Sequence, residues 1–219
     1  MKKLINIGLT VLLVLAISSV IAYAQMTFFL IDNFEDGDYT RNPEWWKFDN
    51  ITLEVKDNPK TEKIDFVAES CGTKSLNITG KAKNWYAGGF GTNVTIDASE
   101  YTRIQFDLYG NDKLGGKVKV ELYEDDNNNN VLEQDSKRGW IATDDDKWVA
   151  EVKVLGDGFT RISIPFSAFA DENPGMGDDT WNPNKVDKSG GLLKVQFIIV
   201  SDDEAGDMDL SVDNVLLTY

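Results

Sequence analysis

The chain has 219 residues, a formal net charge of −15 and no histidine. A surface this acidic repels nucleic-acid phosphates and anionic lipid, so we expect neither as a partner; divalent cations and neutral ligands suit it better. Without histidine, Ser-His-Asp and Cys-His catalysis is excluded, and no motif singles out the two carboxylates of a glycoside hydrolase. We therefore expect a protein that is not an enzyme.

The first 24 residues are typical of a secretory signal peptide. Lys2 and Lys3 precede an apolar run over residues 4–21, and the small-x-small sequence "AYA" follows at 22–24. An uncleaved membrane anchor is the alternative, because the run approaches the ~20 residues that span a bilayer. We predict an exported protein, secreted, at the cell surface or in the periplasm, whose residues 25–219 form a single domain.

Apolar and polar residues alternate with a period of two through much of the remaining chain, as in strands with one buried face. In "RIQFDLY" (103–109), Ile104, Phe106 and Leu108 face one way, and "KVKVELY" (117–123) repeats the pattern. Similar or weaker runs are "TFFLIDNF", "ITLEV", "KSLNIT", "WVAEVKV", "TRISIPF", "LLKVQFIIV" and "LSVDNVLLTY", separated by turn-rich stretches. Many short strands between turns predict an all-β protein, a jelly-roll β-sandwich.

Several of these motifs occur together in a characteristic order. "NFEDGD" comes near the start, a tryptophan soon after it, then "KSLNIT", "FDLYG", "RISIPFSAF" and the terminal "VDNVLL". In this order of motifs the chain resembles family 11 carbohydrate-binding modules and the related complex I intermediate-associated protein 30 domains, over nearly all of residues 27–219. The resemblance implies a galactose-binding-like jelly roll that binds β-glucan in a shallow groove on its concave sheet and holds structural calcium elsewhere.

The candidate metal ligands lie at the two ends of the exported chain. In a jelly roll the first and last strands can lie side by side, which would bring Glu35 close to Asp213. Ca²⁺ takes about six to eight oxygen ligands from carboxylates and carbonyls. The resemblance implies Glu35, the backbone carbonyl of Lys74 and Asp213 as ligands, with Asp32 and Asp38 as nearby candidates. The alternative is that these acids cap turns and face water.

A second acidic segment, "DDNNNNVLEQDSK" (125–137), has part of a calcium-loop pattern. Acids and amides fall at positions 1, 3 and 5 of an EF-hand-like loop that begins at Asp126. However, Val131 stands where such a loop needs Gly, and Lys137 replaces its bidentate Glu. We interpret this segment as a polar hairpin turn.

A sugar-binding groove needs aromatic faces that stack on pyranose rings and polar groups that bond hydroxyls. The polar faces of two successive strands offer such residues, flanked by "KNWYAGGFG". The predicted ligand-binding residues are Arg103, Asp107, Tyr109, Lys119, Glu121 and Tyr123, with Trp85 and Tyr86 beside them. An ordinary solvated sheet is the alternative. We interpret the other tryptophans, Trp45, Trp46, Trp140, Trp148 and Trp181, as core or loop anchors.

Three N-x-T triplets, at Asn50, Asn77 and Asn93, are candidate glycosylation sites in an exported protein, although chance alone produces one or two in a chain of this composition.

The sequence thus predicts a secreted, non-catalytic, calcium-stabilised protein that binds polysaccharide. The alternative is a structural subunit of an extracellular filament, surface layer or flagellar sheath, using the same fold for self-assembly. The lack of an attached catalytic domain favours this alternative, and an exposed N-terminal strand "MTFFLI" (26–31) could pair with a neighbouring subunit.

Overall fold

The computed structural model describes residues 28–58, 72–110, 116–155, 158–186 and 188–219. The predicted signal peptide, residues 1–24, lies outside the described residues. No helix among the described residues is long and apolar enough to span a membrane.

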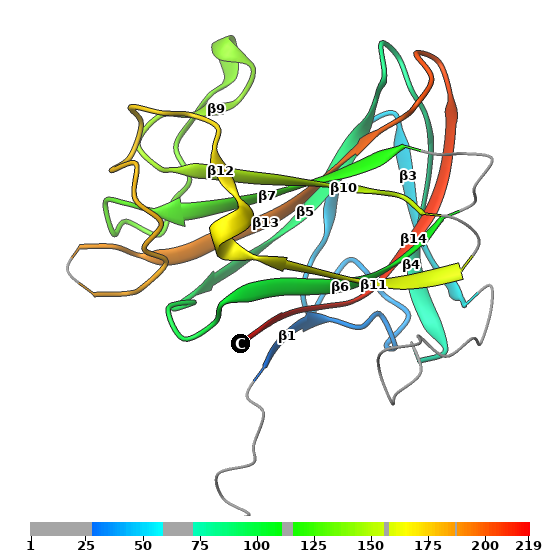
Figure 1. Ribbon diagram of the computed structural model, residues 1–219, viewed down its shortest axis with the longest axis horizontal. Helices are drawn as coiled ribbons and strands as arrows, with labels where there is room; N and C mark the ends of the chain where they lie inside the picture. The colour runs from blue at the N-terminus through cyan, green and yellow to red at the C-terminus, as the bar shows by residue number, and fades with distance from the viewer. Residues whose placement is uncertain (1–27, 59–71, 111–115, 156–157, 187) are drawn as a thin grey trace, which may run out of the picture.

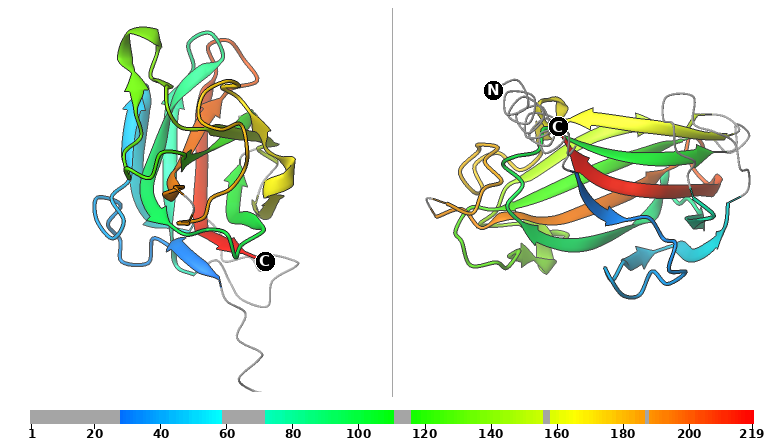
Figure 2. Two further views of the ribbon diagram at one scale, coloured as in Figure 1. Left: turned by 90° about the vertical axis from the view of Figure 1, so that its left-hand side faces the viewer. Right: turned by 90° about the horizontal axis from the view of Figure 1, so that it is seen from below.

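Two antiparallel sheets of six strands each make up the fold (Figures 1 and 2). Sheet I has the order β11 (Gly158–Pro165), β6 (Arg103–Gly110), β14 (Asp207–Thr218), β4 (Lys74–Lys81) and β3 (Ile51–Asp57), with β1 (Phe29–Asp32) also paired to β14. Sheet II has the order β12 (Ala170–Asp171), β10 (Lys147–Lys153), β7 (Lys117–Asp125), β13 (Gly191–Val200), β5 (Tyr86–Ile96) and β2 (Trp46–Asp49). The prediction of an all-β sandwich is confirmed.

Four short elements lie outside the two six-stranded sheets. The hairpin of β8 (Gln134–Asp135) and β9 (Ile141–Ala142) extends from the connection between β7 and β10 (Figure 1). The single-turn helices η1 (Ser136–Arg138) and η2 (Phe166–Ala168) complete the described elements. Pro165 ends β11, an edge strand of sheet I, where its missing N–H breaks no sheet hydrogen bond.

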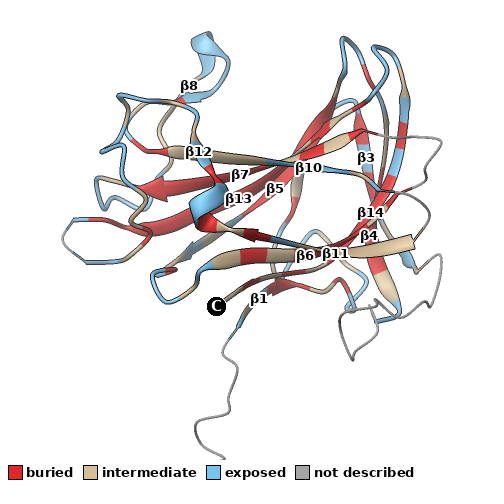
Figure 3. Ribbon diagram, in the orientation of Figure 1, coloured by how far each residue is buried: buried red, intermediate tan, exposed pale blue. Residues whose placement is uncertain are grey.

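The core lies between the sheets because the alternating apolar residues of both point inward. The buried residues lie on strands of both sheets (Figure 3). An aromatic cluster fills its middle: Phe90 stacks on Phe197 with ring centroids 5.0 Å apart, and Phe106 meets Phe197 edge-on at 5.2 Å. Trp45 packs against both Phe34 and Phe90, at 5.8 and 5.6 Å. Its indole Nε1–H donates to Asp32 Oδ2 at 2.8 Å, so the buried polar atom of the ring is satisfied.

The first and last strands of the described chain are neighbours. β1 pairs antiparallel with β14, Phe29 opposite Leu217 and Leu30 opposite Leu216. On the same side of β14, β4 pairs with residues 207–212, so β1 and β4 follow one another along it. The predicted adjacency of the first and last strands is confirmed, and it places the loop after β1 beside the start of β4.

Candidate functional site: a groove on sheet II

The outer face of sheet II carries a groove of about 920 Å³. Residues from five strands of the sheet and from the β7–β10 connection line it. Those used below are Trp46, Phe48, Tyr86, Asn93, Glu121, Tyr123, Val131, Gln134, Trp140, Lys147, Lys194 and Gln196. A concave site that mixes aromatic rings with a few polar groups is typical of small-molecule and sugar binding.

Two glycines of β5 make room for two aromatic rings in the groove. β2 pairs with β5 so that Trp46 stands opposite Gly91 and Phe48 opposite Gly89. A Cβ atom at position 89 would lie 2.3 Å from Phe48 Cζ, and one at position 91 would lie 3.1 Å from Trp46 Cζ2. The "GGFG" sequence therefore lets both rings lie close to the strand, forming an apolar platform at one side of the groove.

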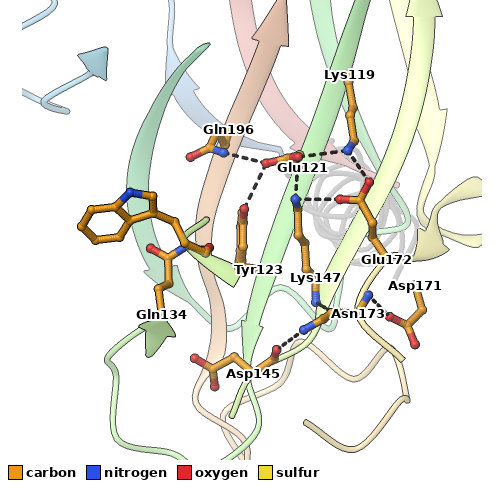
Figure 4. Close-up of polar contacts among 11 residues, drawn as sticks. Lys119, Glu121, Tyr123, Gln134, Asp145, Lys147, Asp171, Glu172, Asn173 and Gln196 are labelled. Carbon is orange, nitrogen blue, oxygen red and sulfur yellow. Dashed lines mark hydrogen bonds and ion pairs between the residues drawn. The ribbon is translucent and has the colours of Figure 1, made fainter. Parts of the chain in front are cut away.

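Glu121 is the centre of the polar groups on the sheet (Figure 4). It is almost fully buried, and its Oε2 accepts hydrogen bonds from Gln196 Nε2 at 2.6 Å and from the Tyr123 hydroxyl at 3.0 Å. Its Oε1 lies 2.7 Å from Lys147 Nζ and 3.3 Å from Lys119 Nζ. Burial, and then the charge of Glu121, raise the pKa of the Tyr123 hydroxyl, so this group stays a donor.

Glu172, just after β12, closes the same network from the edge of the sheet (Figure 4). It forms ion pairs with Lys119 and with Lys147, the latter at 2.6 Å. Burial acts to raise the pKa of its carboxyl, but hydrogen bonds from these two lysines outweigh it, and the pKa is lowered. Two carboxylates and two ammonium groups thus balance in charge and hold one another in place.

Lys194 differs from these lysines because the described residues give it no hydrogen-bond acceptor and no ion-pair partner. It is 6% exposed and lines the groove from β13. Its Nζ lies 4.0 Å from the ring centroid of Tyr123 and 5.9 Å from that of Trp46. Burial lowers the pKa of Lys194 to about 8, with Glu121 opposing the shift and Lys147 adding to it. The groove therefore offers an ammonium group for which the described residues supply no hydrogen-bond acceptor.

The β8–β9 hairpin contributes the second wall of the groove. Trp140, in the turn before β9, is 66% exposed, and its backbone carbonyl accepts a hydrogen bond from Gln134 Nε2 at 2.7 Å. Val131, earlier in the same connection, is also exposed and lines the groove. Exposed apolar groups on a groove wall are typical of binding surfaces.

The structure brings together only part of the predicted ligand-binding set. Tyr86, Glu121 and Tyr123 line the groove, and Lys119 adjoins it through its ion pairs. The structure places the other predicted residues, Arg103, Asp107, Tyr109 and Trp85, elsewhere.

The prediction that the polar faces of the two strands line one groove is wrong, because β6 belongs to sheet I and β7 to sheet II. Arg103, Asp107 and Tyr109 are on β6; Asp107 is fully buried there beside Arg161 and Asn214. Trp85 is 51% exposed and outside the groove lining.

Sequence reasoning missed several groove residues. Trp46 and Trp140 were expected to be core or loop anchors but line the groove, whereas Trp45 is a core residue as expected. A signal for Trp46 was present: the period of two in "WWKF" puts residues 46 and 48 on the face opposite Trp45. Lys194 and Gln196 likewise occupy the polar positions of "LLKVQFIIV".

The predicted calcium residues partly fit a cation. Glu35 Oε1 accepts the backbone N–H groups of Thr73 and Lys74, both at 2.8 Å, which places the "NFEDGD" loop against the start of β4. Asp213 is fully buried, and its Oδ2 has no hydrogen-bond partner among the described residues. Burial, and then the nearby carboxylates of Asp107, Glu35 and Asp32, raise the pKa of Asp213 to about 8. An unsatisfied buried carboxylate oxygen among other acids suits a divalent cation.

The two nearby candidates, Asp32 and Asp38, accept hydrogen bonds from other residues. Asp32 accepts hydrogen bonds from the backbone N–H of Phe34 and from the Trp45 indole. Asp38 accepts from the N–H and hydroxyl of Thr40 and pairs with Arg41. Both carboxylates cap turns, as the alternative interpretation expected, but Asp32 is buried and does not face water.

The asparagine-rich segment is a turn organised by Asp125. Its carboxylate accepts the backbone N–H groups of Asn127 and Asn129 through Oδ1, at 3.2 and 3.3 Å, and that of Asn130 through Oδ2 at 2.6 Å. The first EF-hand-like position, Asp126, instead accepts the N–H of Asp146. The interpretation as a polar turn holds.

The three N-x-T asparagines differ in their surroundings. Asn50 is exposed in the turn between β2 and β3. Asn77, within β4, donates through its Nδ2 to Asp209 Oδ1 at 2.8 Å, and Asn93 lines the groove. Glycosylation stays a prediction. Of the three asparagines, Asn50 is the one whose exposed position in a turn best suits an attached glycan.

Solved structures of carbohydrate-binding modules are similar to this chain. A family 11 carbohydrate-binding module from Clostridium thermocellum, in complex with a β-1,3-1,4-mixed-linked tetrasaccharide, matches with a TM-score of 0.53 and 16% identity, over 89% of this chain and 97% of that one. The family 11 module of a cellulosomal cellulase from Clostridium thermocellum matches with a TM-score of 0.52 and 15% identity, over 89% and 96%. An exo-β-agarase matches with a TM-score of 0.55 and 12% identity, over 87% of this chain but 25% of that one.

No protein-family model and no curated protein matches the sequence. At these identities the structural similarity shows the fold, and it confirms that the resemblance to family 11 modules extends to their jelly roll.

Proposed function

We propose that this protein is a non-catalytic polysaccharide-binding protein whose groove on sheet II holds a β-glucan chain or a related polysaccharide. The observation that carries the proposal is the pairing of Trp46 and Phe48 with Gly91 and Gly89, which lays an aromatic platform beside polar groups. Pyranose rings offer flat C–H faces to such platforms and hydroxyls to the polar groups. The mixed-linked glucan bound to a module of the same fold supports the choice of ligand.

The charges in the groove favour binding over catalysis. A glycosidase acid needs a carboxyl whose pKa is raised, so that it stays protonated at neutral pH. The pKa of Glu172 is lowered, and Glu121 lies between the ammonium groups of Lys119 and Lys147. These carboxylates suit the acceptance of hydrogen bonds from sugar hydroxyls.

The direct test is affinity electrophoresis in gels that contain a soluble mixed-linked β-glucan, with gels that contain mannan or no polysaccharide for comparison. We expect slower migration in the glucan gel. Unchanged mobility on every glucan tested, confirmed by calorimetry at millimolar oligosaccharide, would count against the proposal.

Lys194 is expected to lower the free energy of unfolding while it raises the affinity for polysaccharide. In Lys194→Met the buried ammonium is lost, so we expect a gain in unfolding free energy on the order of 1–3 kcal/mol at pH 7, because one unit of pKa shift corresponds to about 1.4 kcal/mol. Polysaccharide affinity should fall about tenfold through loss of a donor. Chemical unfolding and calorimetry measure the two effects; Lys153→Met, an exposed site on β10, is the matched control.

The same residue predicts a pH dependence with a definite sign. The pKa of Lys194 is about 8 in the folded state, below the ordinary lysine value of 10.5. Between these values the unfolded chain binds more protons than the folded one, so this group makes the protein more stable as the pH rises from 8 to 10.5. The stability difference between the wild type and Lys194→Met should shrink over this range; a constant difference would contradict the account.

A structural Ca²⁺ between the chain's ends is part of the proposal. Asp213 and Glu35 would hold it, and Ca²⁺ would offset the repulsion between these carboxylates and satisfy the free Oδ2 of Asp213. The backbone N–H of Lys74 donates to Glu35. The backbone carbonyl of Lys74 is the third ligand that the resemblance implies.

Export is proposed from the sequence of residues 1–24 alone, and an extracellular or surface location suits a polysaccharide ligand.

One observation favours a second candidate, a structural subunit that self-assembles. Among the described residues β1 pairs only with β14, which leaves its other edge open, and Phe28 and Leu30 at the start of this segment are 55% and 40% exposed. An open edge of this kind can take up a strand from a neighbouring subunit. Electron microscopy of the purified protein distinguishes the candidates: ordered polymers support assembly, and monomers that are retarded on glucan gels support binding.

A further inference from the structure

A cluster of carboxylates lies at the base of the β7–β10 connection, away from Asp213. One oxygen each of Glu124, Asp126 and Asp146 lie within 4.8 Å of one another. Asp146 also belongs to a second group of this spacing, with Asp171 and Asp179. Ligands on opposite sides of a Ca²⁺ ion lie about 4.6–5.2 Å apart, so both groups have the spacing of a coordination shell.

Two oxygens of this cluster are buried and unsatisfied. Asp146 is fully buried, and its Oδ1 has no hydrogen-bond partner among the described residues; the same holds for Asp126 Oδ1. No lysine or arginine in the described part of the chain forms an ion pair with Glu124, Asp126 or Asp146. Buried carboxylate oxygens without a donor or a cation are costly, so a bound cation would stabilise this cluster.

Burial is also the main cause of the pKa shifts in this cluster. It raises the pKa of Glu124 to about 8, and neighbouring carboxylates add to the shift. Burial likewise raises the pKa of Asp146 to about 6. Both shifts have the direction expected of buried acids that repel one another.

Gly177 brings the backbone of a third segment onto the cluster. A Cβ atom at this position would lie 2.3 Å from Asp126 Oδ2 and 2.5 Å from Asp146 Oδ1, and its φ is +59°. Only glycine permits both this approach and this conformation. The N–H of Thr180 then donates to Asp146 Oδ2 at 3.2 Å. The segment after β12 is therefore shaped around the two carboxylates.

We propose that Glu124, Asp126 and Asp146, extended by Asp171 and Asp179, bind a divalent cation, and that this cation is Ca²⁺. All five side chains offer hard oxygen ligands, which Ca²⁺ accepts in flexible numbers and geometries, whereas Mg²⁺ demands a near-ideal octahedron. The site is independent of the chain-end site at Asp213, which belongs to β14 in sheet I.

The cation joins the two ends of the segment that carries the groove wall. Asp126 and Asp146 delimit residues 126–146, and the N–H of Asp146 donates to Asp126 Oδ2 at 2.8 Å. This segment contains Val131 and Trp140 of the groove.

The segment after β12 is tied to the same place. Asn173 donates to the carbonyl of Asp145 at 2.8 Å and accepts the N–H of Lys147 at 2.7 Å (Figure 4). Lys147 in turn reaches Glu121 and Glu172. We infer that the bound cation fixes both the hairpin wall and Glu172. This coupling rests on the proposed function; binding of the cation does not.

Calorimetric titration of the EDTA-treated, full-length protein with Ca²⁺ tests the site. The wild type should bind Ca²⁺, and Asp146→Asn should bind one equivalent less. Asp144→Asn is the matched control, because Asp144 is an exposed neighbour that bonds only to Thr143 in the described structure. Asp213→Asn should leave the Asp146 site intact, which separates it from the chain-end site.

Terbium luminescence gives a local readout of the same site. The Trp148 indole donates to Glu124 Oε1 at 2.7 Å, so excitation of Trp148 should sensitise Tb³⁺ bound there. Trp45, which bonds Asp32, would also sensitise Tb³⁺ at the chain-end site, so the comparison is made in an Asp213→Asn background. There the signal should be lost on adding Asp146→Asn and kept on adding Asp144→Asn. If Asp146→Asn does not fold, Asp179→Asn, at an exposed position, should still weaken Ca²⁺ binding about tenfold. Wild-type Ca²⁺ stoichiometry and luminescence in Asp146→Asn or Asp179→Asn would overturn the proposal. So would a wild-type protein that takes up no Ca²⁺.

The coupling is tested by comparing polysaccharide affinity in Ca²⁺ and in EDTA. Affinity should fall on chelation in the wild type and in Asp213→Asn, with no further fall in Asp146→Asn. If no polysaccharide binds in either condition, the proposed function fails while the Ca²⁺ titration still decides the cation site. Equal affinity in both conditions would contradict the coupling.

Discussion

Trp46→Ala is expected to weaken polysaccharide binding by roughly 30-fold, because truncation of a central aromatic anchor typically costs about 2 kcal/mol. Trp46 lies across Gly91 in the groove and is within reach of the ammonium group of Lys194. Without the indole, the sugar loses its stacking surface and β5 is exposed to water. Calorimetry with a soluble β-glucan measures the loss.

Trp85→Ala is the control for this prediction. Trp85 is also a tryptophan close to the N-terminal end of β5, but it is 51% exposed, lies outside the groove and makes its hydrogen bonds through its backbone. Its loss should change affinity less than about twofold, since surface substitutions rarely exceed 0.5 kcal/mol or so. Equal losses in the two variants would place the ligand elsewhere.

Trp45→Ala is expected to lower the unfolding free energy by about 3–5 kcal/mol, the usual cost of truncating a large core aromatic. Trp45 is 2% exposed, packs against Phe34 and Phe90, and satisfies Asp32. Trp45→Phe separates the two contributions: it keeps most of the packing but leaves Asp32 Oδ2 without its donor, for a cost of about 1–3 kcal/mol.

Chemical unfolding followed by circular dichroism measures both Trp45 variants, with Trp46→Ala as the neighbouring control. The two tryptophans are adjacent in sequence but face opposite sides of the chain, one in the core and one in the groove. We expect Trp45→Ala to change mainly stability and Trp46→Ala mainly affinity. A larger loss of stability in Trp46→Ala than in Trp45→Ala would contradict this assignment.

The period-two pattern predicted the strands because each has one face in the core. It correctly predicted β6, β7 and β13, and it assigned Ile104, Phe106 and Leu108 to the interior. Pairing of the first and last strands was also predicted, since it follows from the jelly-roll class and the chain-end motifs.

What the pattern could not predict is which strands share a sheet. Arg103 and Asp107 of β6 alternate in the same way as Lys119 and Glu121 of β7, but β6 pairs with β11 and β14, whereas β7 pairs with β10 and β13. These pairings are non-local, so the local sequence does not distinguish a polar face in sheet I from one in sheet II. The prediction therefore combined residues from opposite sides of the molecule.

The same limit applies to residues that come together through register or through loops. The "WWKF" pattern indicates that Trp46 faces away from Trp45, but only the register with β5 places it over Gly91. Glu124 and Asp146, and likewise Asp146 and Asp179, are far apart in the sequence and come together through the path of two connections. Asp126 alone showed a calcium-loop pattern, and its partners could not be read from its neighbours.

Titration of the labelled protein with a mixed-linked β-glucan tetrasaccharide, followed by heteronuclear NMR spectroscopy, tests the groove most directly. The account predicts that the largest shifts fall on the Trp46 indole and on the amides of Tyr123, Lys194 and Gln196, with the amides of Arg103 and Tyr109 in sheet I unchanged. Shifts centred on sheet I, or none at millimolar oligosaccharide, would contradict it.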